Sequence, residues 1–181
     1  ATCGFSTKNA SIAYFNSGLI EWILSIVMIL VGIHFGLIYA TVTGKRNNIF
    51  RSEITRFYFA IIIGASVCIA FSLWFADVYP SILVSLRNAL FHTASFITTT
   101  GYATADCNLW PSFAILTLIF CSIVCACAGS TSGGLKIDRL LLAIKMLRNR
   151  IRSQQHPTAV IRTKIDGVSQ DSEMLGTVSV Y

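Results

Sequence analysis

The chain has 181 residues, of which 54% are hydrophobic and only 12% are charged. Because soluble domains carry about 25% charged residues, this composition excludes an ordinary soluble protein and indicates a membrane protein. The basic residues behind the net charge of +6 gather in two connections between apolar stretches, residues 45–56 and 145–164. Such connections mark the cytoplasmic side, and anionic lipid explains them better than nucleic acid does, because each borders an apolar stretch.

The chain opens with a pattern of threonine, glycine and an aromatic residue that occurs twice. Residues 2–9 (the first Thr-Gly segment) and residues 99–106 (the second Thr-Gly segment) both read Thr-x-Gly-aromatic-small-Thr-x-Asx. A repeated pattern argues for duplicated structural units. Non-helical backbone survives at membrane depth only where protein buries it or where it lines a water-filled cavity. The repeat therefore favours a pore-lining element over an ordinary extracellular loop, the alternative that either copy alone leaves open.

Two predicted spans follow the first Thr-Gly segment. Residues 19–42 exceed the roughly 20 residues needed to cross the hydrocarbon core, and residues 56–75 form a second apolar stretch after a basic turn at residues 44–48. Gly32 and Gly36 in the first span would let a neighbouring helix approach closely. His34 between them is expected to be a hydrogen-bonded packing residue.

Residues 81–97 are too short and too polar for a full crossing, since they include Arg87, Asn88, His92 and Thr93. A re-entrant half-helix fits them better. Its C-terminal end would direct partial negative charge towards the centre of a pore, which favours a cation there. Arg87 and His92 are interpreted as packing and interface residues without a catalytic role.

The last predicted membrane segment, residues 112–147, is too long for one straight crossing. Glycine and hydroxyl residues interrupt it at residues 128–136 (the interrupting loop), and each glycine costs about 1 kcal/mol relative to alanine in a helix. We expect helices at residues 112–127 and 137–147 with an irregular loop between them in mid-membrane. Lys136 should face protein or a wet cavity, because a cation is costly there.

A phosphate-binding loop is the alternative interpretation of the interrupting loop. It fails the G-x-x-x-x-G-K-[ST] pattern, because Leu135 separates Gly134 from Lys136, so an enzyme of that kind is disfavoured. The spacing of Cys121, Cys125 and Cys127 similarly suggests a metal site. No histidine or fourth thiol stands near them in the sequence, and packing of small residues between helices is favoured.

The chain has three motifs, at residues 2–12, 98–106 and 128–136, that occur in the order known from one family of membrane proteins. They resemble the Trk/Ktr/HKT superfamily of potassium transporters, and most closely its bacterial Trk-type membrane subunit. The resemblance implies an all-α membrane protein of tandem M1–pore helix–M2 repeats around one axis, with re-entrant pore loops and a broken M2 helix. Residues 1–48 would be the filter and M2 helix of the second repeat, 49–150 the complete third repeat, and 151–181 the cytoplasmic linker and the start of the fourth. The chain would then be an internal fragment.

By this resemblance, the two Thr-Gly segments would be strands of a selectivity filter whose backbone carbonyls bind dehydrated K⁺. The filter residues would be Thr2, Cys3, Gly4, Phe5, Thr99, Thr100, Gly101 and Tyr102. The gate under the filter would consist of Gly129, Ser130, Thr131, Ser132, Gly133, Gly134 and Lys136. Cys3 departs from the family pattern, in which glycine or another small residue is usual, and Ser132 stands where glycine is common.

The leading hypothesis is therefore potassium uptake across the bacterial cytoplasmic membrane, with K⁺ as the transported ion, no cofactor and no enzymatic activity. The alternatives are a sodium-coupled or weakly selective K⁺/Na⁺ transporter of the same superfamily, and a non-conducting membrane scaffold. The resemblance also implies a cytosolic nucleotide-binding regulatory subunit of the Rossmann (RCK) type and a homodimer of the full-length protein. The lipid bilayer is the other expected partner, and nucleic acid is not expected.

Overall fold

The computed structural model describes residues 3–43, 52–155, 164–165 and 168–169. Helices dominate this part of the chain, as the sequence predicts, and the strands are only two residues long. In chain order the elements are a 3₁₀ helix Ser11–Phe15, α1 Gly18–Val31, α2 Phe35–Val42, α3 Glu53–Phe75, α4 Ile82–Ile97, a 3₁₀ helix Cys107–Leu109, α5 Ser112–Ile123, β1 Val124–Cys125, β2 Leu135–Lys136, α6 Ile137–Gln155, β3 Lys164–Ile165 and β4 Val168–Ser169.

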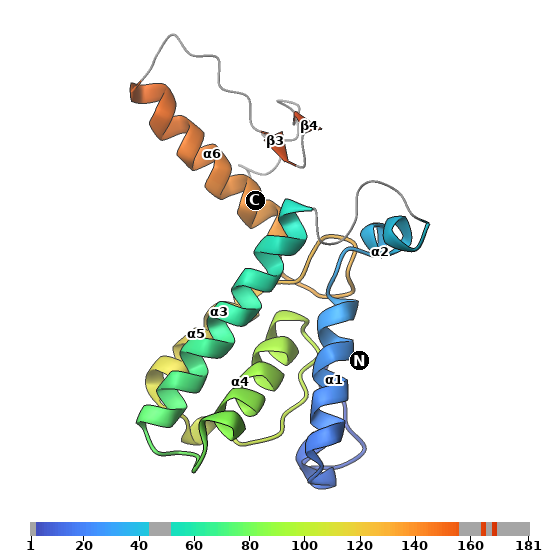
Figure 1. The fold of residues 1–181 in the computed structure, drawn as a ribbon, viewed down its shortest axis with the longest axis vertical. Coiled ribbons are helices and arrows are strands. Elements are labelled where there is room, and N and C mark those ends of the chain that lie inside the picture. Colours follow the sequence, from blue (N-terminus) through green and yellow to red (C-terminus); the bar gives the residue numbers. More distant parts are fainter. Residues whose placement is uncertain (1–2, 44–51, 156–163, 166–167, 170–181) are drawn as a thin grey trace.

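The central helix of the bundle is α4. It packs against α1, α3 and α5, and these four helices lie side by side, whereas α2 and α6 extend from one end of them (Figure 1). The core around the N-terminal half of α3 includes buried apolar residues from α3, α4, the strand after α5 and the start of α6, among them Tyr58, Ile97, Val124 and Ile137. The helix predicted at residues 81–97 is thus enclosed by the three helices around it.

By length and composition, α3 is the one helix among residues 3–43 and 52–155 that could cross a bilayer unbroken. The pair α1 and α2 passes the same test together but is bent by 94° at a short break. Helices α4 and α5 are apolar and shorter. The larger number of crossings expected from the sequence stays a prediction.

The break between α1 and α2 corrects the prediction of one continuous helix at residues 19–42. Cys127 donates its backbone N–H to the Gly32 carbonyl oxygen at 3.1 Å, so this carbonyl bonds to a distant segment. His34 then starts α2 by accepting the Gly36 N–H on Nδ1 at 3.0 Å. His34 is therefore a hydrogen-bonded residue, as expected, and caps the second half of the broken helix.

The interruption in the last membrane segment starts earlier than predicted, because α5 ends at Ile123 instead of Cys127. Strand β1 pairs in parallel with β2, with Val124 opposite Leu135 and Cys125 opposite Lys136. Ala126 donates its N–H to the Ile97 carbonyl at 3.0 Å. The backbone groups directly after α5 thus bond to β2 and to the end of α4 instead of continuing the helix.

Candidate ion-conduction site

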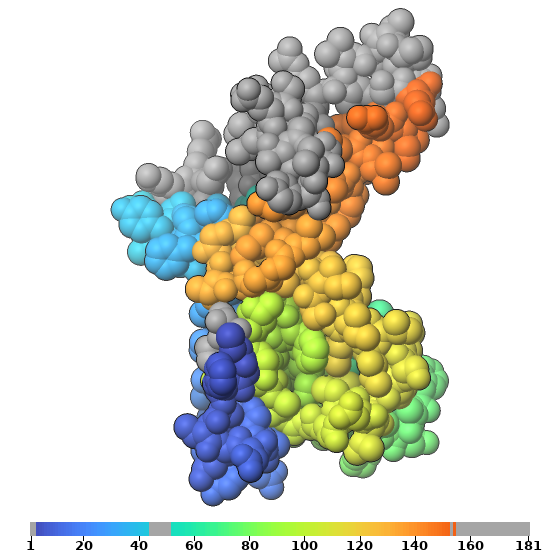
Figure 2. Space-filling model, turned by 180° about the vertical axis from the view of Figure 1, so that it is seen from behind, coloured from blue at the N-terminus to red at the C-terminus, as the bar shows by residue number. Residues whose placement is uncertain are grey.

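The two Thr-Gly segments lie side by side, although they come from distant parts of the sequence. Gly4 donates its N–H to the Thr100 carbonyl at 2.8 Å. Further along, Ile12 donates to the Ala103 carbonyl at 3.2 Å, and Ala103 donates to Ser11 Oγ at 3.3 Å. Figure 2 shows the first residues, in dark blue, along the green residues of α4 and the segment after it. The two copies of the motif therefore form one paired unit.

Glycine has a conformational role in both copies. Gly4 has φ +69° and Gly101 has φ +77°, values in the left-handed region that side-chain-bearing residues rarely adopt. Thr99, next to the second glycine, also has a positive φ of 51°. The backbone of the second segment therefore departs from helical geometry directly after α4, and the shared Thr-x-Gly pattern reflects a shared backbone shape.

The C-terminal end of α4 holds the second segment in place. The Ser95 carbonyl accepts the Thr100 N–H at 2.9 Å, and Ser95 Oγ donates to the Tyr102 carbonyl at 2.8 Å. Thr98 donates its hydroxyl to the Ala94 carbonyl at 2.7 Å, and its Oγ1 lies 2.8 Å from Thr100 Oγ1. The backbone around Gly101 is thus tied to the helix on both sides of the glycine.

The predicted filter residues differ in their environments. Cys3, Phe5 and Gly101 are exposed, Thr100 is buried, and Thr2 lies outside the described residues. The Thr100 carbonyl, which the sequence assigns to ion binding, bonds to Gly4 of the paired segment. Ion binding by these carbonyls stays a prediction.

The interrupting loop is closed by its own polar groups. Lys136 Nζ donates to the Ser130 carbonyl at 3.1 Å and also to the Ser132 carbonyl. Ser130 Oγ lies 2.9 Å from Ser132 Oγ. Asp138, at the start of α6, accepts the Ala128 N–H on Oδ2 at 2.7 Å. Lys136 thus faces protein, as expected for a cation within a membrane protein.

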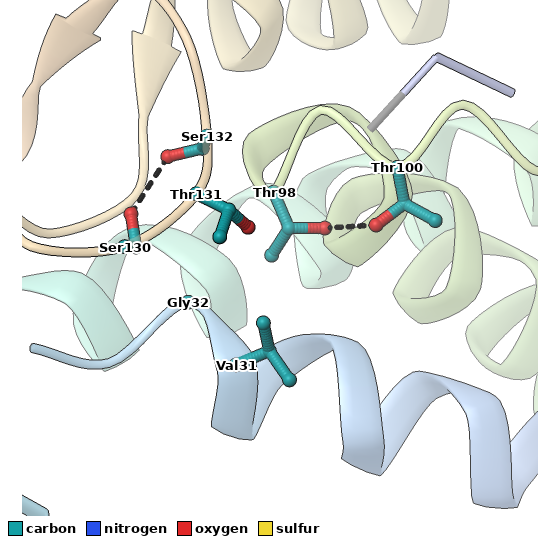
Figure 3. Close-up of a pocket in the computed structure, with 7 residues that line it drawn as sticks. All are labelled: Val31, Gly32, Thr98, Thr100, Ser130, Thr131 and Ser132. Atoms are coloured by element: carbon teal, nitrogen blue, oxygen red, sulfur yellow. Dashed lines mark hydrogen bonds between the residues drawn. The ribbon is translucent and has the colours of Figure 1, made fainter. Parts of the chain in front are cut away.

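The interrupting loop also touches the second Thr-Gly segment. Gly133 donates its N–H to Thr99 Oγ1 at 3.3 Å. A cavity of about 40 Å³ separates the loop from the segment; its lining residues are Val31, Gly32, Thr98, Thr100, Ser130, Thr131 and Ser132 (Figure 3). The close-up shows the threonines of α4 and the second segment on one side and residues 130–132 on the other. Five of its seven lining residues carry hydroxyl groups, and its volume suits about three water molecules at about 10–15 Å³ each.

Sequence reasoning overlooked one charged contact near this site, the ion pair between Glu21 of α1 and Arg87 of α4. Arg87 was expected to be a packing or interface residue without a catalytic role, and the structure places its side chain against Glu21 of α1. The sequence feature that could have predicted this pair is Glu21 itself, because a carboxylate in the first turn of an apolar helix needs a partner. Within the described part of the chain, no group of three or more His, Cys, Asp and Glu residues could hold a metal ion.

Comparison with known proteins places this geometry in a family. A family model described as "TrkH: Cation transport protein" matches residues 1–178. The chain is 32% identical to the Trk system potassium uptake protein TrkH of Salmonella typhimurium and 33% identical to that of Escherichia coli K12, each time over 97% of this chain and 36% of the relative. It therefore spans little more than a third of the length of these relatives.

The crystal structure of the potassium transporter TrkH from Vibrio parahaemolyticus has the same fold, with a TM-score of 0.87 and 29% sequence identity over 97% of this chain and 38% of that one. The range matched by the family model includes both Thr-Gly segments, α4 and the interrupting loop. Family and fold therefore agree over the whole candidate site. The chain belongs to the TrkH family of cation transport proteins.

Proposed function

We propose that the protein containing this chain takes up K⁺ across the cytoplasmic membrane, and that its two Thr-Gly segments are strands of the selectivity filter. The pairing of these segments through the 2.8 Å bond from Gly4 N to the Thr100 carbonyl carries the proposal. Two copies of one motif held side by side can offer equivalent carbonyl oxygens to one ion, and carbonyls that replace the hydration shell are the basis of K⁺ filters. The potassium uptake proteins among the relatives support this function.

The paired arrangement is compatible with ion coordination. A carbonyl oxygen has two lone pairs, so Thr100 can accept the Gly4 N–H with one and coordinate a cation with the other. The positive φ angles of Gly4 and Gly101 turn the backbone at equivalent points of the two segments. Each strand has a single glycine, and a transporter that discriminates only weakly between K⁺ and Na⁺ is therefore the alternative that the test must distinguish.

The helices fit the proposed repeat architecture of the family. We assign α3 as M1 of the third repeat, α4 as its pore helix, and α5 with α6 as its broken M2; α1 and α2 would be the M2 helix of the second repeat. Support comes from α4, which is shorter than α3 and ends where the second Thr-Gly segment begins. Further support comes from α5 and α6, which the interrupting loop separates.

We assign the interrupting loop as the gate. Its Gly133 N–H bonds to Thr99 of the proposed filter, and the 40 Å³ cavity between them leaves little space for a hydrated ion. Deleting residues 129–134 while keeping α5 and α6 in register should raise K⁺ flux. Unchanged or lost flux in a properly inserted deletion variant would instead favour a packing kink without a gating role.

The partner proposals rest on the charged end of the chain. A nucleotide-binding regulatory subunit on the cytoplasmic side would meet the basic residues of α6, including Arg148, Arg150 and Arg152, which are exposed. Reversing these three charges should weaken co-purification or regulation. A homodimer of the full-length protein is proposed on the same family basis, and cross-linking in membranes would test it.

Uptake of Rb⁺ by the full-length protein, in cells lacking other K⁺ uptake systems, tests the proposed function directly. We expect saturable uptake that K⁺ competes for more effectively than Na⁺. Equal competition by the two ions would favour the weakly selective transporter. No uptake by a correctly inserted protein would favour the non-conducting scaffold and overturn the proposal.

A further inference from the structure

An ion pair between a buried glutamate and a partly exposed arginine joins α1 and α4, the helices next to the two Thr-Gly segments. Glu21, in the first turn of α1, is only 7% exposed. Its Oε2 lies 2.8 Å from Nε of Arg87 on α4. The Nε–H is not aligned with this oxygen, and neither atom has a hydrogen-bond partner, so the contact is electrostatic. A carboxylate buried in this way depends on its partner, because removing one charge leaves the other uncompensated.

The backbone around Glu21 is shaped to accept the arginine. A Cβ atom at Gly18, one turn earlier on α1, would lie 2.5 Å from Arg87 Nη1. The guanidinium group therefore occupies the space that a side chain at position 18 would fill. Gly18 and Glu21 lie on the same face of α1, since residues three apart are neighbours on a helix. Gly18 thus leaves the space for the Arg87 guanidinium, and Glu21 supplies the opposite charge beside it.

Each end of the ion pair is connected to one Thr-Gly segment. On the α1 side, the first segment runs through the 3₁₀ helix Ser11–Phe15 into the turn of α1 that carries Glu21. On the α4 side, Asn88 follows Arg87 and accepts the Thr104 hydroxyl on Oδ1 at 3.0 Å. The pair thus closes a ring of contacts that includes the Gly4–Thr100 and Ile12–Ala103 hydrogen bonds.

We infer that Glu21 and Arg87 are positioning residues that set the spacing between the two filter segments and thereby the K⁺ over Na⁺ selectivity of the transporter. This inference rests on the proposed function. Neither side chain needs to touch the ion. They act through α1 and α4, because a carbonyl site discriminates between ions by the number and arrangement of its oxygens, and both depend on how the strands are held.

The test measures Rb⁺ uptake and its competition by Na⁺ in the full-length protein, together with its abundance in the membrane. The variants are Glu21→Gln, Arg87→Gln and the charge exchange Glu21→Arg with Arg87→Glu. We expect both single variants to raise uptake of Na⁺ relative to K⁺ roughly two- to tenfold, the lower part of the range for couplings between contacting residues. The exchange should recover part of the wild-type preference. Neutralising Asp77 as Asp77→Asn, an exposed residue outside both Thr-Gly segments, should leave the preference unchanged.

Two milder variants cover the case in which the neutralised proteins do not reach the membrane. Arg87→Lys keeps the charge but replaces the planar guanidinium by a single ammonium group. Gly18→Ala leaves both charges and pushes the guanidinium aside. Each should shift the ion preference at normal abundance. Wild-type preference in every inserted variant would overturn the inference while leaving the proposed function intact, whereas absence of Rb⁺ uptake by the wild-type protein would overturn the proposed function itself.

Discussion

Gly4 and Gly101 meet backbone to backbone. A Cβ atom on Gly101 would lie 2.9 Å from both N and Cα of Gly4, and a Cβ atom on Gly4 would lie 2.7 Å from the Gly101 carbonyl oxygen. Both distances are too short for a real side chain, and the obstructing atoms belong to the backbone, which cannot rotate away. The two copies of the motif therefore need glycine for the same mutual contact as well as for its positive φ.

Substituting either glycine should damage the proposed filter. Gly101→Ser and Gly4→Ser each combine a left-handed backbone with this steric conflict, and residues held in sparsely populated backbone regions cost roughly 1–3 kcal/mol each. We expect both variants to lose K⁺ selectivity or uptake, measured as Rb⁺ uptake with and without Na⁺. Gly64→Ala on α3 is the matched control, because nothing lies within 4 Å of a Cβ atom there. Normal selectivity in both serine variants would contradict the filter assignment.

Lys136 should restrain the interrupting loop. Lys136→Met removes two hydrogen bonds from a charged donor to the Ser130 and Ser132 carbonyls, and such bonds contribute about 1.5–3 kcal/mol each. If the loop is a gate, its closed form loses stability and Rb⁺ uptake rises. Lys136→Arg keeps the charge and serves as the control. Equal uptake rates for wild type and Lys136→Met, at equal abundance, would argue against a restraining role for the lysine.

Gly32 and Tyr58 form a close contact that should be visible in protein stability. A Cβ atom on Gly32 would lie 2.2 Å from Tyr58 Oη, so Gly32→Ala should destabilise the protein by about 1–3 kcal/mol, the usual cost of overpacking. Tyr58→Phe loses the hydrogen bond to the Ile29 carbonyl, which costs about 1 kcal/mol, but it also removes the obstructing oxygen. The double variant should be more stable than Gly32→Ala alone in a thermal unfolding assay in detergent. If the double variant loses as much stability as the two single variants together, the added methyl group is not obstructed by the Tyr58 hydroxyl.

Cys107 should react slowly with alkylating reagents at neutral pH. Burial, and secondarily the charge of Asp106, raise the pKa of its thiol from 9.0 to about 11. Only the thiolate is nucleophilic, so a shift of this size lowers the reactive fraction at pH 7–8 roughly a hundredfold. The alkylation rate of Cys107, followed by peptide mass spectrometry, should keep rising as the pH approaches 11. Asp106→Asn removes the nearby negative charge and should raise the alkylation rate at a fixed pH. An alkylation rate that levels off near pH 9 would contradict the raised thiol pKa.

Much of the candidate site could be predicted from the sequence, because it depends on local chemistry. The repeated Thr-x-Gly pattern marks both left-handed turns, since glycine is the residue that adopts them without strain. The polarity and length of residues 81–97 predict a short helix, which α4 confirms with a start at Ile82. The glycine and hydroxyl residues at positions 128–136 predict an interruption, and the structure has one between α5 and α6.

The remaining features depend on contacts between residues that are far apart in the chain. Residues 19–42 are apolar enough for one helix, and the break at Gly32 becomes favourable only because Cys127 bonds to its carbonyl. Helix α5 ends early because β1 finds β2 as a partner. Glu21 tolerates burial only because Arg87 reaches it from α4. Membrane character, motifs and glycine positions were thus determined by the sequence itself, whereas tertiary structure decided where helices break and which buried charges pair, because both require a bonding partner that folding alone brings within reach.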